Sequence, residues 1–176
     1  MSGGPKVLMD ELLCAGRRVK LYRRTVEYGG EIFYRDLVAF GEAVVVVPVR
    51  EDGKILFVEQ WRASFNRWIV ELPAGRVEPG EDPLESAKRE LEEETGFQAG
   101  IWEPLGRFSV APGYSDEILN FFLARDLKYV GQHPEKGEVL RVVEMKPEEY
   151  LQRISGDVGD LKSVAGVLLV IAKRIA

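Results

Sequence analysis

The residues most able to do chemistry in this 176-residue chain lie in one acidic stretch between Gly75 and Phe97. The stretch holds eight acidic residues in twenty-three positions, and the three glutamates at 92–94 are consecutive. Because like charges repel, such a density is unfavourable unless protons or cations compensate the charge. The sequence therefore raises the question of which cation these carboxylates bind.

A helix over residues 83–95 would bring three of the carboxylates to one side. Asp82 can cap this helix, Pro83 suits its first turn and Gly96 suits its C-terminal stop. At about 100° per residue, Glu90, Glu93 and Glu94 fall within an arc of about 100°, beside apolar positions that can pack inward.

Glu92 points to the far side of this helix. A hard divalent cation is the natural partner of the three clustered anions, and Mg²⁺ suits one or two carboxylates plus a phosphate. A solvated, charged helix face is the alternative reading of a glutamate-rich helix.

The composition limits the classes of protein that can carry this stretch. Hydrophobic residues make up 45% and charged residues 30%, which is typical of a globular domain, and the net charge is −5. This charge does not favour nucleic acid or an anionic membrane as a partner. Cys14 is the only cysteine, and the N-terminus lacks the pattern of a signal peptide, so we expect a cytoplasmic protein. The longest apolar run, residues 164–172, is too short to cross a bilayer.

The elements that must position the carboxylates are strands with few helices between them. Gly29 and Gly30 indicate a tight hairpin between strands 17–28 and 31–38. Further strands are expected over residues 43–49, 55–61, 68–75, 105–111, 117–124 and 139–145, and closing helices over 147–155 and 161–176. We predict an N-terminal β-hairpin extension, residues 1–40, that serves dimerisation, and a main domain, residues 41–176. The fold class predicted is α/β, with a mixed sheet in an α/β/α sandwich.

The spacing of the acidic stretch resembles the Nudix box, the signature of hydrolases of nucleoside diphosphates linked to another moiety. The pattern is Gly, five residues, Glu, seven residues, Arg-Glu, an apolar residue, any residue, Glu-Glu, any residue, Gly and an apolar residue. It is met at Gly75, Glu81, Arg89, Glu90, Leu91, Glu93, Glu94, Gly96 and Phe97.

This resemblance implies a Nudix fold and a role for several residues. Glu90 and Glu94 match the main ligands of Mg²⁺, for which Mn²⁺ is a possible substitute. Glu93 matches a further ligand or orienting carboxylate, and Ala74 would offer its backbone carbonyl. The motif positions with a structural role are Gly75, Glu81, Arg89 and Gly96.

The flanks resemble the ADP-ribose pyrophosphatase branch over about residues 15–175. "FVEQWR" matches a strand whose arginine, here Arg62, contacts the nucleotide, and Pro112 lies sixteen residues after Gly96. The branch implies cleavage of ADP-ribose to AMP and ribose 5-phosphate by a homodimer built partly from the N-terminal strands. The implied substrate-binding residues are Arg62, Glu71, Pro112, Gly113 and Glu117.

Two questions stay open at this level. The substrate could be another sugar nucleotide, such as GDP-mannose or another ADP-sugar, and a binding module without catalysis is a further alternative. The general base is also open, because Lys136 occupies the position where the branch carries its usual glutamate. We favour Glu138 as the base, with Glu135 and Glu93 as alternatives. Trp61 and Trp68 could stack on a base or pack in the protein.

Overall fold

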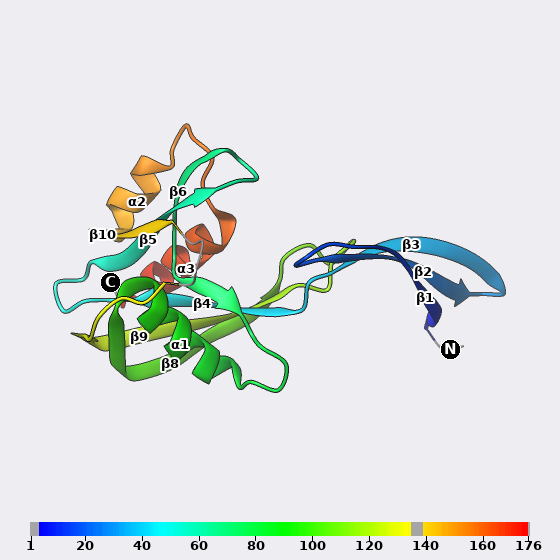
Figure 1. Cartoon of the computed structure of the whole chain (residues 1–176), viewed down its shortest axis with the longest axis horizontal. Helices are drawn as coiled ribbons and strands as arrows, with labels where there is room; N and C mark the ends of the chain where they lie inside the picture. Colours follow the sequence, from blue (N-terminus) through cyan, green and yellow to red (C-terminus); the bar gives the residue numbers. More distant parts are fainter. Residues whose placement is uncertain (1–3, 135–138, 176) are drawn as a thin grey trace. The chain divides into compact units, whose positions relative to one another are not determined.

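The computed structural model describes residues 4–134 and 139–175, which form two compact units (Figure 1). The first unit contains the chain up to Glu42 together with residues 108–119, and the second contains residues 43–107 and 120–176. Within residues 4–134 and 139–175, no helix has the length and apolarity that crossing a membrane requires.

The first unit is a three-stranded antiparallel sheet in the order β1-β2-β3, with strands β1 (Lys6–Ala15), β2 (Lys20–Tyr28) and β3 (Glu31–Ala39). The expected hairpin is β2–β3: Tyr28 pairs with Glu31, and the turn glycines Gly29 and Gly30 have φ of 63° and 82°. Strand β1 was not predicted. All ten of its residues are exposed, so its sequence carries no alternation between a buried and a solvated face.

The segment 108–119 closes the end of this sheet. The N–H of Val38 donates to the carbonyl of Tyr114 at 2.7 Å. The carboxylate of Asp116 accepts from the N–H of Phe40 at 2.7 Å and from that of Gly41 at 3.2 Å. Two stretches of chain that lie about seventy residues apart therefore build the first unit together.

In the described part of the second unit, the chain forms two sheets and three helices (Figure 1). One sheet has the order β10-β5-β6 and the other the order β7-β4-β9-β8. The strands are β4 (Glu42–Pro48), β5 (Ile55–Arg62), β6 (Arg67–Glu71), β7 (Ala74–Arg76), β8 (Phe97–Ser109), β9 (Ile118–Tyr129) and β10 (Leu140–Met145). The helices are α1 (Pro83–Thr95), α2 (Pro147–Arg153) and α3 (Leu161–Ala172).

Strand β4 is buried on both faces, as its apolar run predicts. On one face Val44 and Val46 share a core cluster with Ala87 and Leu91 of α1. On the other, α3 approaches so closely at Gly166 that an added Cβ would lie 3.0 Å from Cγ2 of Val47. Helices on both sides of the strand confirm the predicted α/β class and layered arrangement.

One strand predicted from the sequence is divided into two strands in the structure, β6 and β7. Residues 68–75 were predicted as a single strand, but the chain leaves the first sheet at Glu71 and enters the second at Ala74. Pro73 lies between the two, and it lacks the N–H that a continuous ladder needs. Its carbonyl instead accepts from the N–H of Val46 at 2.9 Å. This transfer between sheets places β7 beside α1.

Candidate active site

Helix α1 begins and ends at the residues that the sequence predicts. The side chain of Asp82 accepts from the N–H of Leu84 at 2.9 Å, and Pro83 occupies the first turn. Gly96, with φ of 78°, ends the helix and donates its N–H to the carbonyl of Glu92. Both caps are local signals, so the boundaries of the helix that carries the carboxylates follow directly from the sequence.

Two carboxylates of α1 are held against strand β7. Oε2 of Glu94, a residue only 3% exposed, accepts from the N–H of Ala74 at 3.1 Å. The carboxyl group of Glu90 occupies the space beside Gly75, where an added Cβ would lie 1.9 Å from its carboxyl carbon. Glycine is therefore required at position 75 to make room for Glu90. The strand–loop–helix unit thus brings Glu90 and Glu94 to one edge of β7.

Arg89 organises the acidic residues around the helix. Its Nη1 donates to Glu90 at 2.7 Å and to Glu93 at 3.1 Å, and its Nε donates to Glu81 at 3.2 Å. A further bond of 3.2 Å reaches the carbonyl of Arg76 at the end of β7. The hydrogen bonds from Arg89 lower the pKa of Glu81 to about 2. One guanidinium thus ties the loop before α1, the helix and β7 together.

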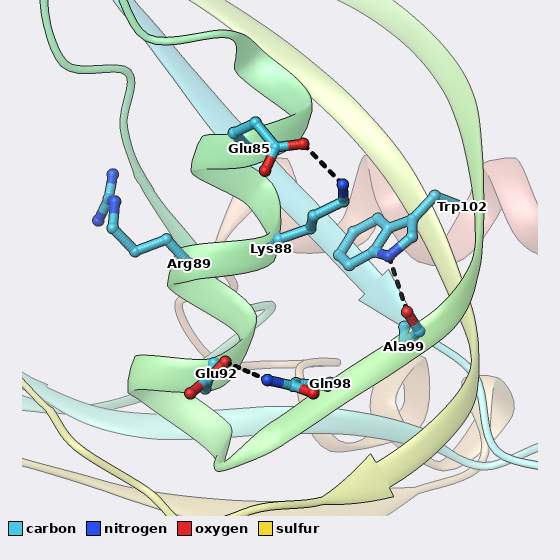
Figure 2. Close-up of a pocket in the computed structure, with 7 residues that line it drawn as sticks. All are labelled: Glu85, Lys88, Arg89, Glu92, Gln98, Ala99 and Trp102. Carbon is cyan, nitrogen blue, oxygen red and sulfur yellow. Dashed lines mark hydrogen bonds and ion pairs between the residues drawn. The ribbon is translucent and has the colours of Figure 1, made fainter.

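The opposite side of α1 carries a separate hollow, lined by Glu85, Lys88, Arg89, Glu92, Gln98, Ala99 and Trp102 (Figure 2). Here Lys88 pairs with Glu85 at 2.6 Å, and the side chain of Gln98 donates to Glu92 at 2.8 Å. Glu92 lies on this side, as the helical arc predicts. Its carboxylate bonds to a neighbouring amide, away from the β7 edge where Glu90 and Glu94 meet.

A second charged group lies where β6 ends. Glu71 is 3% exposed, and its two oxygens accept from Nε and Nη2 of Arg62 at 2.6 and 2.7 Å. Lys162 of α3 also donates to Glu71. Burial raises the pKa of Glu71, but the bonds with Arg62 and the charge of Lys162 outweigh that effect and the pKa is lowered. Arg62 and Glu71, two of the expected substrate-binding residues, are therefore joined in one pair.

This pair is within electrostatic reach of Glu94 on α1. The pKa of Arg62 is raised, first by its bonds to Glu71 and further by the negative charge of Glu94. Two residues, Leu72 and Pro73, separate Glu71 from Ala74, whose N–H donates to Glu94. A cationic side chain and two carboxylates therefore lie around the bend between β6 and β7, an arrangement suited to a phosphate and a metal ion.

Residues 39–165 match the sequence profile described as the NUDIX domain. The chain belongs to the NUDIX family. The ADP-ribose pyrophosphatase of Bacillus subtilis is 37% identical, over 92% of this chain and 90% of its own length. The methanol dehydrogenase activator of Bacillus methanolicus has the same identity and the same coverage. The crystal structure of an ADP compounds hydrolase superposes with a TM-score of 0.84 and 22% identity, covering 99% of this chain and 98% of its own, which supports the Nudix fold.

Nudix hydrolases generally need a divalent metal, and the β7 edge offers oxygen ligands for one. Among residues 4–134 and 139–175, no three Asp, Glu, His or Cys side chains form a complete metal site. A metal that is shared with a substrate phosphate needs only one or two carboxylates, however. Glu90 and Glu94 meet that need, and in a strand the carbonyl of Ala74 faces the same edge as its N–H. The donor set therefore fits a hard divalent cation.

The remaining expected residues fall into two groups. Pro112, Gly113 and Glu117 lie in the first unit, in the segment that closes its sheet, where the N–H of Glu117 donates to the hydroxyl oxygen of Ser115 at 3.2 Å. Glu135, Lys136 and Glu138, on which the prediction of the general base depends, lie outside the described residues.

The chain just before that loop is attached to the C-terminal end of α1. The N–H of His133 donates to the carbonyl of Glu93 at 3.2 Å, and the side-chain amide of Gln132 donates to the carbonyl of Glu94. These bonds occupy carbonyl groups that the C-terminus of a helix otherwise leaves without partners. The sequence alone carries no local signal for either contact.

The sequence reasoning also missed the cluster on α3. Lys162 and Ser163 reach the end of β6, and Nζ of Lys162 also donates to Asp160 at 2.8 Å. The available signal was an aspartate that can cap a helix, followed two residues later by a lysine. That signal locates the start of α3 but does not indicate which strand the lysine meets.

Proposed function

We propose that this chain hydrolyses the pyrophosphate bond of ADP-ribose, with Mg²⁺ as the metal, and releases AMP and ribose 5-phosphate. Water adds to one phosphorus atom, and the bridging oxygen leaves with the other phosphate. The observation that carries the proposal is the convergence of Glu90 and Glu94 on the Ala74–Gly75 edge, with Arg62 within electrostatic reach of Glu94. The similarity to an ADP-ribose pyrophosphatase over nine-tenths of both chains supports this substrate.

Each residue of the site has a role in this reaction. Glu90, Glu94 and the carbonyl of Ala74 would hold the metal, and Glu93 is a further ligand or the general base. A bound Mg²⁺ neutralises the phosphate oxygens and lowers the pKa of the attacking water. Arg62, held by Glu71, would bind a phosphate oxygen of the substrate, since guanidinium is suited to bidentate contacts with phosphate.

The general base remains a prediction from the sequence. A carboxylate within hydrogen-bond reach of the water contributes about 10²–10⁴-fold to such reactions. We propose Glu138 for this role, with Glu135 and Glu93 as the alternatives. Pro112, Gly113 and Glu117 are proposed to contact the nucleotide sugar, as the resemblance to the ADP-ribose branch implies.

We also propose that the protein works as a homodimer through its N-terminal extension, residues 1–40, while residues 41–176 form the hydrolase domain. The support is the exposure of large apolar side chains on β1, where Val7, Leu8, Met9, Leu12 and Leu13 are 42–57% exposed. A contiguous exposed apolar surface is typical of a protein interface. A cytoplasmic location, inferred from the single cysteine, is part of the same proposal.

The alternatives differ in substrate or in the absence of turnover. Another ADP-sugar or GDP-mannose would use the same metal chemistry. A sensing module that binds without cleavage is disfavoured, because this chain retains Glu90, Glu93 and Glu94 of the motif.

The decisive experiment is product analysis over a panel of nucleotide sugars, with Mg²⁺ and with EDTA. The panel includes ADP-ribose, ADP-glucose, GDP-mannose and the nicotinamide dinucleotides, since one relative is described by its effect on a dehydrogenase. We expect AMP and ribose 5-phosphate from ADP-ribose with Mg²⁺ and no turnover with EDTA. Preferred turnover of GDP-mannose would overturn the substrate, and binding of ADP-ribose without products would favour the sensing module.

A further inference from the structure

The N-terminal end of helix α3 contacts the charged pair at the end of β6. Lys162 donates to Oε2 of Glu71, the same oxygen that accepts from Nη2 of Arg62 at 2.7 Å. Lys162 is well shielded, with a side chain 17% exposed, and that of Glu71 is 4% exposed. Two cations thus share one buried carboxylate. Burying a charged carboxylate without such partners would carry a large cost in folding free energy, as is found for other buried charges.

Asp160 fixes Lys162 in this place. Oδ2 of Asp160 accepts from Nζ of Lys162 at 2.8 Å and from the N–H of Ser163 at 3.0 Å, where it caps α3. The negative charge of a capping carboxylate is favoured by the N-terminal end of the helix dipole. The helix dipole therefore offsets part of the negative charge of Asp160. Lys162 remains able to neutralise the negative charge of Glu71.

The helix is also fastened to the backbone of the same bend. The hydroxyl oxygen of Ser163 accepts from the N–H of Leu72 at 2.6 Å. One turn later Gly166 packs so tightly that an added Cβ would lie 2.4 Å from Cδ1 of Leu72. The lysine therefore projects from a helix end that is fixed to the residue following Glu71, which limits how far it can move.

We propose that Lys162 is a positioning residue for Arg62: by sharing the carboxylate of Glu71, it fixes the orientation of the Arg62 guanidinium toward a substrate phosphate. The proposal rests on the proposed function, in which Arg62 binds that phosphate. With Lys162 present, Glu71 has a second cation, so the positive charge of Arg62 is not wholly committed to Glu71. Without Lys162, Arg62 alone must neutralise a buried carboxylate and is drawn away from an anionic ligand.

The test is a double-mutant cycle on steady-state kinetics with Mg²⁺, using Lys162→Met, Arg62→Met and the double variant. For metal ligands, removing the partner that orients the ligand typically costs about 10–100-fold in affinity or activity, and we expect an effect at the lower end of that range here. We expect Lys162→Met to raise KM for ADP-ribose about tenfold while kcat changes less than about threefold. Because Lys162 acts through Arg62, it should raise KM no further when Arg62 is already methionine.

Three variants complete the design. Lys162→Arg keeps the cation and should keep KM within about threefold of the native value, whereas Lys162→Gln should resemble Lys162→Met. If the methionine variant does not fold, the comparison of Lys162→Arg with Lys162→Gln tests the proposal in its place. Lys88→Met, which removes a lysine paired with Glu85 on the far side of α1, is the matched control and should leave KM unchanged.

Each outcome of the cycle decides the proposal. A lower melting temperature with unchanged KM would show a purely structural lysine and overturn it. Multiplicative effects of Lys162→Met and Arg62→Met on KM would show independent action and overturn it as well. Failure of the proposed function is recognised separately, because the native protein would then leave ADP-ribose intact. The cycle would in that case use the nucleotide sugar of the panel that the native protein does hydrolyse.

Discussion

The backbone N–H of Ala74 donates to Oε2 of Glu94 across 3.1 Å, and this bond joins β7 to α1 at an almost fully buried carboxylate. A carboxylate at this depth is orientated by its surroundings and not by solvent. Its neighbour on the helix, Glu90, is orientated in another way, by the absence of a side chain at Gly75. The two proposed metal ligands are thus placed by the backbone of one short strand, which leads to the first two predictions.

Glu94→Gln should abolish most of the activity while the protein remains folded. The substitution preserves size but removes a charged metal ligand, and we expect a loss of about 10²-fold or more in kcat. Glu92→Gln is the matched control, because Glu92 bonds to Gln98 on the opposite side of α1. Circular dichroism verifies the fold of both variants, and equal kinetics for the two would refute the assignment.

Gly75→Ala should lower activity through Glu90. The new Cβ would lie 1.9 Å from the carboxyl carbon of Glu90, so this side chain must move. A displacement of about 1 Å at a reacting centre can cost about 10²-fold in rate. Gly4→Ala, where an added Cβ has nothing within 4 Å, is the control. Native kcat in Gly75→Ala would mean that Glu90 tolerates other positions.

The stabilising effect of Glu81 should disappear in acid. Its bonds with Arg89 lower its pKa from 4.5 to about 2, so the folded state favours the charged carboxylate. The contribution is complete above pH 4.5 and is lost as the pH falls toward 2. The difference in melting temperature between the native protein and Glu81→Gln should therefore be constant from pH 5 to 7 and shrink between pH 4.5 and 3. A difference that widens on acidification would contradict this pairing.

The general base can be identified by comparing Glu138→Gln, Glu135→Gln and Glu93→Gln at saturating Mg²⁺. We expect Glu138→Gln to lose about 10²–10⁴-fold in kcat, the usual contribution of a positioned base. Glu135→Gln should remain near the native rate. Full turnover by the Glu138 variant would transfer the assignment to Glu93, which belongs to the motif helix itself.

The dimer should be visible by sedimentation at micromolar concentration, at twice the 19.8 kDa mass of the chain. Leu12, 52% exposed on β1, is expected in the interface, so Leu12→Asp should shift the equilibrium toward the monomer. Lys88→Asp on α1 introduces the same side chain elsewhere and should leave the mass unchanged. A native monomer with full activity would remove the dimer from the mechanism.

What the sequence predicted well depends on local signals. The bounds of α1 follow from Asp82, Pro83 and Gly96, and the buried strand β4 follows from its apolar run. The candidate site followed from a motif whose spacing is read directly along one helix. In each case the residues that determine the structure lie within a few positions of one another.

The features that were missed have no such signal. Strand β1 has no buried face, so its side chains show no alternation. The change of sheet after Glu71 depends on which partner each half of the segment meets. The contact of Lys162 with Glu71 joins residues 91 positions apart, and such a pairing is set by packing and not by local pattern.

The way in which residues 108–119 complete the first sheet has a consequence for how this protein could be rebuilt. Asp116 accepts a hydrogen bond from the backbone of Phe40, and the carbonyl of Tyr114 accepts one from the backbone of Val38. The N-terminal strands therefore cannot be exchanged as a separate module with a single boundary. A chimaera that exchanges only the first 42 residues with those of a relative would combine strands from one parent with a closing segment from the other. Transplanting both segments together is the exchange that preserves this unit, so recombination within the family must treat them as one inherited piece.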